Sequence, residues 1–395
     1  VSGNESVSEA RIRRIAGLPE GAVFDPEELD NSAKRLRRTG TFSSVALTEA
    51  ERPNPDGTLD ILLRVQEDKP RRIGFGAELS SDEGGVVTAY WLHRNLLGGA
   101  ERFEVDAEIS GIGTGAADDG EDYRLEARFR RPAVLDADTD LFLGGGLESI
   151  DDPLFESDQA MLLAGFIRNF SDEFEGSAAI GYRYASTRDD LGEREFSQLI
   201  LPVTATFDRR DDTLNPTEGY YLDGEAMPFV GLNDTASGVR LIGDARIYRA
   251  LGENDRVVLA GRLQMGSVLG PDITETMPDD LFYLGGGGTV RGQDYQSLGV
   301  TLPGGERVGG RSYVALSAEV RARLRGAFGL VGFYDAGFVS EESFPDGDSE
   351  RQGGAGIGLR YDTGIGPLRV DLAVPTTGPN AGEDIYFYLG IGQAF

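Results

Sequence analysis

The sequence of 395 residues contains no cysteine and a single histidine, His93. Without cysteine there can be no disulfide framework, no thiolate metal site and no cysteine nucleophile. A serine–histidine triad or a histidine-ligated metal site would depend on His93 alone, and the residues around it favour a structural place in a strand. We therefore expect a protein that is not an enzyme and that needs no cofactor and no metal.

Positive charge is also scarce, because 38 Lys and Arg residues face 67 Asp and Glu residues and leave a formal net charge of −29. An acidic field repels phosphate, so we expect no nucleic-acid partner. No apolar run approaches the roughly 18 residues that a transmembrane helix requires. Two classes remain: a soluble protein, or a membrane β-barrel, whose strands alternate in polarity. The chain opens at Val1 with neither Met nor a signal peptide, which favours a processed or trimmed form.

Residues 1–69 combine helical spacing with a short stretch of strand spacing. Asp25, followed by a proline, is a typical N-cap for a helix that Gly40 would end. An earlier helix is expected after a capping box formed by Ser6 and Glu9. Alternating apolar residues beyond Gly40 then indicate a hairpin. We predict one small α+β domain over this stretch.

From residue 71 onward the apolar period is two residues, which is typical of strands. In one such segment Tyr123, Leu125, Ala127 and Phe129 alternate with Arg124, Glu126, Arg128 and Arg130. About sixteen segments of this kind can be counted, starting near residues 71, 85, 101, 122, 139, 159, 174, 195, 219, 237, 255, 312, 327, 351, 365 and 384.

Two features separate a membrane barrel from a soluble sandwich or a small soluble barrel. The segments recur about every 20 residues, whereas sandwich strands recur every 8 to 12. Charged residues also cover whole strand faces, as expected for a wet lumen with lipid on the other side. We predict a membrane all-β fold, in which residues 70–395 form a 16-stranded antiparallel transmembrane β-barrel. Its longest loop would span about 269–311.

The first and last barrel strands are rich in glycine. "RRIGFGAEL" places Phe75 outward between two inward glycines, and "DIYFYLGIGQAF" places its Leu and Phe residues outward. Glycine weakens a strand by roughly 0.5–1 kcal/mol per position, although it also suits crowded lumens. We predict a weak seam between these strands that could act as a lateral gate, formed by Gly74, Phe75, Gly76, Leu389, Gly390, Gly392 and Phe395.

Five motifs stand out in the second half of the chain. They are "VRGQ" at 290–293 within a glycine-rich link, "FDRRDDTLNPTEGYYLDGEA" at 207–226, "SAEVRARL" at 317–324, "GFYDAGFV" at 332–339 and "GAGIGLRYDTGIGPLRVDLAVP" at 354–375. Together with the N-terminal module, they resemble the outer-membrane assembly superfamily that includes BamA, TamA and the two-partner secretion transporters. In that family a POTRA domain precedes a 16-stranded barrel. "YWLHRNLLGGAERF" at 90–103 and the "GPLR" run are most similar to the TamA branch.

The resemblance implies a role for the lone arginine of the glycine-rich link. In the family this loop folds back into the lumen, and its tip, here Val290, Arg291 and Gly292, is latched when the arginine pairs with acidic residues of the wall. By motif position these are Glu319 and Asp335, and the strand period independently places Glu319 on the inward face. Gln293 stands where the family signature has an aromatic residue. An exposed loop with an incidental arginine is the alternative.

The resemblance also implies a function and a location. The barrel would lie in the Gram-negative outer membrane with residues 1–69 in the periplasm. Strands of nascent outer-membrane β-barrel proteins or autotransporters would pair with the edge at residues 71–80, while the outer-membrane lipid beside the last strand is thinned. A TamB-like periplasm-spanning protein would bind through the POTRA domains, of which others would precede Val1. A BamA-like assembly core, a two-partner secretion pore or a porin are the alternatives.

Overall fold

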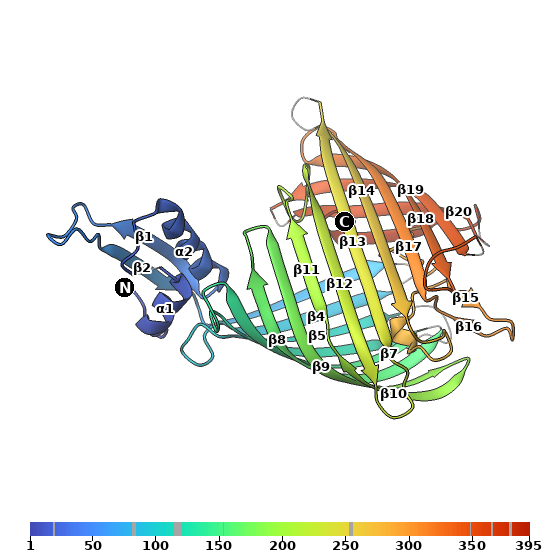
Figure 1. Ribbon diagram of the computed structural model, residues 1–395. Helices are drawn as coiled ribbons and strands as arrows, with labels where there is room; N and C mark the ends of the chain where they lie inside the picture. The colour runs from blue at the N-terminus through green and yellow to red at the C-terminus, as the bar shows by residue number, and fades with distance from the viewer. Residues whose placement is uncertain are drawn as a thin grey trace.

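A computed structural model gives the protein a small N-terminal domain beside one end of a closed β-barrel (Figure 1). The structure describes residues 1–18, 20–80, 84–113, 120–152, 154–252, 256–347, 349–364, 366–378 and 381–395, and it leaves the side chains of 78–80 undescribed. The outward direction expected for Leu79 therefore lies outside the described side chains. None of the described helices combines the length and the apolar composition needed to cross a membrane.

The N-terminal domain packs helices α1 (Glu9–Ala16) and α2 (Pro26–Arg38) against the hairpin of β1 (Phe42–Glu49) and β2 (Ile61–Glu67). Asp25 caps α2 as predicted, because its carboxylate accepts a hydrogen bond from the N–H of Glu27. The cap predicted for α1 is wrong: Ser8 fills that place, and Ser6 instead contacts the carboxylate of Glu67.

The core of this domain is an apolar cluster of both helices and both strands, and it includes two alanines from turns of the barrel, Ala100 and Ala133. The other buried members are Val7, Ile12, Ile15, Ala16, Ala33, Leu36, Phe42, Val45, Leu63 and Val65. Because the cluster includes barrel residues, the domain is packed onto the barrel and not merely tethered to it.

Strand segments of one antiparallel sheet close the barrel. They are β3 (Arg71–Ser80), β4 (Gly85–His93), β5 (Arg102–Ile112), β6 (Asp122–Arg131), β7 (Thr139–Asp152), β8 (Phe155–Asn169), β9 (Phe174–Asp189), β10 (Gly192–Ile200), β11 (Val203–Asp208), β12 (Gly219–Gly231), β13 (Gly238–Leu251), β14 (Val257–Leu269), β17 (Ser312–Arg323), β18 (Phe328–Ser340), β19 (Glu350–Thr363), β20 (Gly366–Thr377) and β21 (Tyr386–Ile391).

The described residues form seventeen such segments, but β10 and β11 occupy one position, because each pairs with both β9 and β12. Leu201 and Pro202 separate the two segments. Proline has no N–H to donate to the ladder, so the strand is interrupted there without leaving its place. The barrel therefore has the sixteen positions that the sequence period predicted.

Apolar side chains face outward from the barrel and many polar ones face the lumen. In β17, Leu316 and Val320 are exposed on the outer surface, whereas Glu319 and Arg321 are buried on the inner one. This arrangement excludes the soluble alternative, in which the apolar stripes would pack against each other. Closure into a barrel also pairs most of the backbone N–H and C=O groups at strand edges, which lipid could not hydrogen-bond.

The β14–β17 connection, residues 270–311, lies at the end of the barrel opposite to the N-terminal domain (Figure 1). It contains the short helix η2 (Pro278–Asp280) and the two-stranded ribbon of β15 (Val300–Thr301) and β16 (Arg307–Val308). Its apolar side chains are buried with residues of the barrel wall, so the loop is folded into the lumen. The alternative of an exposed loop is wrong.

Candidate functional site

The lumenal loop is held first by apolar packing. Buried loop residues share one cluster with wall residues of β10, β12, β14, β17 and β18. The loop members are Ile273, Leu281, Phe282, Leu284, Val290, Leu298, Val300, Leu302 and Val308. Val290, the first residue of the predicted tip, is fully buried. The cluster brings the next residue, Arg291, against the wall of the barrel.

Three glycines leave room for the tip. Gly292 has a φ of +87°, a left-handed conformation that glycine adopts without strain. A Cβ atom on Gly354 of β19 would lie 1.9 Å from the carbonyl oxygen of Arg291. A Cβ atom on Gly337 of β18 would lie 2.7 Å from a methyl carbon of Val290. Bare backbone at these positions lets the loop approach the wall closely.

The structure brings Arg291 together with both predicted carboxylates. Its Nε lies 2.7 Å from Oδ2 of Asp335 and its Nη2 lies 3.0 Å from Oδ1, so this pair is forked. Its Nη1 donates to Oε1 of Glu319 across 2.8 Å. The guanidinium also lies over the ring of Phe333, 3.6 Å from the centroid, in a cation–π contact.

A third carboxylate, which we did not predict, completes the site. Nη1 of Arg291 lies 3.3 Å from Oδ2 of Asp371 in β20. The signal was present in the sequence, because Asp371 alternates with the outward residues Val370 and Leu372 and must therefore face the lumen. We call Arg291, Glu319, Asp335 and Asp371 the Arg291 cluster.

All four charged side chains of the Arg291 cluster are almost completely buried, and Arg291 itself retains 3% of its exposed surface. Removing one partner of a buried ion pair costs about 3–5 kcal/mol, because the other charge is left without compensation. The geometry therefore opposes withdrawal of the loop tip from the lumen. The role of the cluster as a latch stays a prediction.

Further contacts tie the tip to the strands beside the seam. Gln293 donates from Nε2 to the carbonyl oxygens of Gly353 and Thr377, at 2.6 and 2.9 Å. The N–H of Gly292 donates to the hydroxyl of Tyr388, and the hydroxyl of Tyr386 donates to Asp294. Both tyrosines belong to β21, so the tip contacts the last strand directly.

The seam, meaning the junction of β21 with β3, is the shortest ladder among the described residues of the barrel. Within the part of β3 and β21 that the structure describes, two residue pairs join the strands, Tyr388 with Ser80 and Leu389 with Leu79. By comparison, β3 pairs with β4 at nine positions. The β21-facing edge of residues 71–78 is therefore not covered by β21, and a free edge can pair with another strand.

Of the predicted gate residues, those before Gly392 lie in β3 and β21, and the glycines of β3 have a further structural reason. Phe75 points outward and is 82% exposed. A Cβ atom on Gly74 would lie 2.1 Å from the ring of Tyr90, and one on Gly76 would lie 2.5 Å from the hydroxyl of Thr88. These glycines make room for inward side chains of β4. Gly390 and Leu389 lie in β21, with Leu389 outward as predicted.

The prediction that Phe395 faces outward with Leu389 is wrong. At Gly392 the backbone has a φ of +95°, and the strand alternation stops there. Phe395 is 7% exposed and packs in the lumen with Tyr248 and Ala260. Sequence period alone could not reveal this change of direction, because a glycine can continue a strand or turn the chain.

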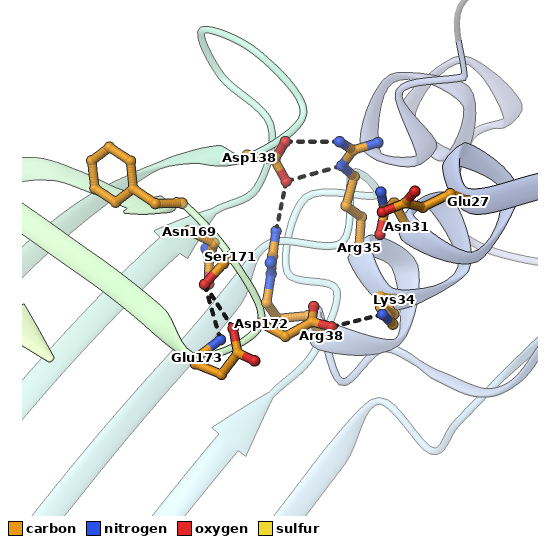
Figure 2. A pocket seen from close by; sticks show the side chains of 11 residues that line it. Glu27, Asn31, Lys34, Arg35, Arg38, Asp138, Asn169, Ser171, Asp172 and Glu173 are labelled. Atoms are coloured by element: carbon orange, nitrogen blue, oxygen red, sulfur yellow. Dashed lines mark hydrogen bonds and ion pairs between the residues drawn. The ribbon is translucent and has the colours of Figure 1, made fainter. Parts of the chain in front are cut away.

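Ion pairs join α2 to turns at the near end of the barrel (Figure 2). Arg35 forks onto Asp138 with two hydrogen bonds of 2.9 Å, and Arg38 reaches the same carboxylate at 3.3 Å. Lys34 lies 2.6 Å from Asp172 in the β8–β9 turn. These residues line a polar cavity of about 350 Å³ between the two domains.

The electrostatics of this contact favour ionised Asp138. Burial raises the pKa of its carboxyl group, but hydrogen bonds and charge from Arg35 and Arg38 outweigh burial and hold the pKa below its usual value. The same partner raises the pKa of Arg35 against the effect of burial. The pair is therefore charged over the physiological pH range.

Two family profiles together cover most of the chain. The profile described as the Omp85 superfamily domain matches residues 95–395. A POTRA profile, described as surface antigen variable number repeat, matches residues 1–68.

Curated relatives match at low identity over nearly all of the chain. The outer membrane protein assembly factor BamA of Nitratidesulfovibrio vulgaris is 24% identical over 418 residues, which cover 100% of this chain and 50% of that protein. The chloroplastic outer envelope protein 80 of Arabidopsis thaliana is 23% identical over 423 residues, which cover 98% of this chain and 54% of that protein. The chain thus spans about half the length of the curated relatives it matches.

Solved structures share the fold. The crystal structure of BamA from Haemophilus ducreyi lacking POTRA domains 1-3 has a TM-score of 0.77 at 18% identity, covering 98% of this chain and 82% of that one. CdiB from Acinetobacter baumannii has a TM-score of 0.69 at 14% identity, covering 98% of this chain and 71% of that one. At such identities the likeness concerns the fold alone.

Proposed function

Because the chain belongs to the Omp85 superfamily, we propose that it promotes the insertion of β-barrel proteins into the outer membrane through its seam. Members of this family are outer-membrane proteins with periplasmic POTRA domains, and the chain has the corresponding place: barrel in the outer membrane, N-terminal domain in the periplasm. The observation that carries the proposal is the β3 edge over residues 71–78 that β21 leaves uncovered.

A nascent strand could complete its own hydrogen bonds on this edge. The free N–H and C=O groups of β3 act as a template for strand addition, and the pairing is independent of client sequence. No covalent bond forms or breaks in this step, so the proposed function is not enzymatic and needs no cofactor.

The lipid beside the seam would assist insertion. β21 has 6 residues, whereas its neighbour β20 has 12. At about 3.4 Å per residue, β21 spans only about 20 Å, less than the roughly 30 Å of a bilayer core. A shorter strand offers a shorter apolar belt, and lipid adapts to it by thinning. A thinner bilayer lowers the barrier for client strands.

Within the family we propose a TamA-like role with autotransporters among the clients. The "YWLHRNLLGGAERF" and "GPLR" motifs support this branch. A TamB-like periplasm-spanning protein would then bind the POTRA region. A BamA-like assembly core is the alternative within the same class.

A two-partner secretion pore is the second candidate, since CdiB shares the fold. The lumen argues against an open channel, because the loop over residues 270–311 is packed into it with its own apolar cluster. Conductance in planar bilayers separates the two: an insertion factor is expected to give small, brief openings, and a secretion pore a large, stable channel.

The proposal is tested by trapping clients on the edge of β3. A photo-cross-linking residue at Phe75 is expected to capture nascent outer-membrane proteins, because this exposed side chain flanks the free edge. As the control, the same photo-cross-linking residue replaces Leu259, which is exposed on the fully paired strand β14. Equal capture at both positions, or none at Phe75, would contradict insertion at the seam.

A further inference from the structure

The last four residues of the sequence, 392–395, leave the line of β21 and enter the lumen. We call them the tail. The turn is fixed by backbone hydrogen bonds, since the N–H of Gly392 donates to Pro367 and the N–H of Gln393 donates to Leu214. The ring of Phe395 then packs against Tyr248, with 6.4 Å between ring centroids.

Two buried arginines bind the tail. Nη2 of Arg321 donates to the main-chain oxygen of Phe395 across 3.0 Å. Nε of Arg360 donates to Oε1 of Gln393 across 2.9 Å. Both arginines project inward from the wall, Arg321 from β17 and Arg360 from β19. The tail is therefore held by groups whose charge must be balanced elsewhere.

The balancing carboxylates are members of the Arg291 cluster. Glu319 accepts from Arg291 on Oε1 and from Arg321 on Oε2, each across 2.8 Å. Asp371 accepts from Arg291 on Oδ2 and from Arg360 on Oδ1. Each carboxylate is thus shared between the loop tip and an arginine that holds the tail. Two continuous chains, each made of ion pairs and a final hydrogen bond, join the tip of the loop to the tail.

The tail has a second possible position on β3. Continuing the register of Leu389 with Leu79 would place Ile391 opposite Ala77 and Phe395 opposite Ile73. In that position Phe395 would face outward with Leu389, as the alternation of the sequence predicts. The tail would then cover the edge that the proposed function leaves for clients. The sequence pattern therefore fits the extended tail, and the structure contains the lumenal one.

We propose that Arg321 and Arg360 are positioning residues that couple the Arg291 cluster to the seam. While Arg291 is paired with Glu319 and Asp371, Arg321 and Arg360 can also donate hydrogen bonds to the tail. The tail then stays in the lumen, and the β3 edge stays free. When the loop tip withdraws, both carboxylates lose a cationic partner. Arg321 and Arg360 then direct all of their donors to Glu319 and Asp371, because a buried carboxylate needs a compensating positive charge. The tail loses its hydrogen bonds to both arginines and is released onto β3. This inference rests on the proposed function, because the covered edge is the one that would receive clients.

The coupling can be measured by thiol cross-linking in the full chain, which has no cysteine of its own. The pair Ala77→Cys and Ile391→Cys reports the extended tail, because these positions meet only if the seam register continues. The pair Ala260→Cys and Ala394→Cys reports the lumenal tail, since Ala394 packs against the cluster that contains Ala260. The 77–391 pair lies outside the Arg291 cluster. Ala260 is paired in register with Glu319, so the 260–394 yield is always compared with that of the same cysteine pair in the otherwise unchanged protein.

Arg291→Ala is expected to raise the cross-linking yield of the cysteine pair at 77 and 391 several-fold. It should lower the yield of the pair at 260 and 394. The double variant Arg321→Gln with Arg360→Gln should do the same while the loop stays in place. Arg128→Gln is the matched control, because this lumenal arginine pairs with Asp106 on a distant wall and should change neither yield. Unchanged yields in both test variants of folded protein would overturn the coupling. Client insertion is scored separately: shifted yields with normal insertion would uphold the coupling and refute insertion at the seam.

Discussion

The backbone N–H of Gly292 donates a hydrogen bond to the hydroxyl group of Tyr388 across 3.0 Å. This bond connects the tip of the lumenal loop with the last strand of the barrel, and it lies beside the buried pairs of Arg291. The two features that the sequence singles out, a lone arginine on a glycine-rich loop and a weak seam, are therefore in direct contact.

Replacing Arg291 by alanine should leave a folded barrel with a loosened loop. The change strands Glu319, Asp335 and Asp371 in a buried site, and the cost is expected to be about 3–5 kcal/mol. Limited proteolysis of the variant in membranes should show faster cleavage within residues 281–296. Cleavage at the rate of the unchanged protein would show that the cluster does not hold the loop.

Gly354→Ala should displace the loop tip without altering any charge. The added methyl group would overlap the carbonyl oxygen of Arg291, so the tip cannot dock and the loop should become protease-sensitive. Gly332→Ala is the matched control in β18, because a Cβ atom there meets nothing within 4 Å. An unaffected Gly354→Ala variant would mean that the tip does not dock where the structure places it.

Tyr388→Phe removes one hydrogen bond and keeps the ring. The N–H of Gly292 loses its partner, and the expected destabilisation of the loop is about 1–3 kcal/mol, less than for Arg291→Ala. Hydrogen exchange of the Gly292 amide should become faster, while exchange in β14 stays unchanged. Equal protection in both proteins would argue against the contact between tip and last strand.

The contact between α2 and the barrel should depend on pH. The pKa of Asp138 is held below its usual value, so the ionised carboxylate stabilises the contact between α2 and the barrel above about pH 4. This stabilisation is lost as the pH falls through the lowered pKa. Asp138→Asn should remove that dependence and loosen the domain at neutral pH. Cross-linking between α2 and the β6–β7 turn as a function of pH measures both effects. A pH profile that is identical in the variant would exclude Asp138 as the titrating group.

The barrel was predictable because its signal is repeated along the chain. Outward residues such as Leu316 and Val320 follow a strict period, and sixteen repeats of that period leave few other folds. The interruption at Pro202 did not disturb this period, because β10 and β11 keep the same neighbours.

The site was predictable only where local pattern decides geometry. Glu319 follows from strand parity, and Asp371 could have been found in the same way. The direction of the tail could not, because Gly392 is compatible with both an extended strand and a turn, and contacts distant in sequence decide between them. The docking of α2 on Asp138 likewise depends on residues 103 positions apart.

The central claim is that clients enter through the junction of β3 with β21, and a disulfide lock tests it most directly. Leu79→Cys with Leu389→Cys joins two positions that are paired in the backbone register of the seam, whereas Leu259→Cys with Val320→Cys joins a register pair on β14 and β17. Client insertion is measured in membranes before and after reduction. The account predicts that the seam lock abolishes insertion, that reduction restores it, and that the control lock has no effect. Full insertion with the seam locked would contradict the account.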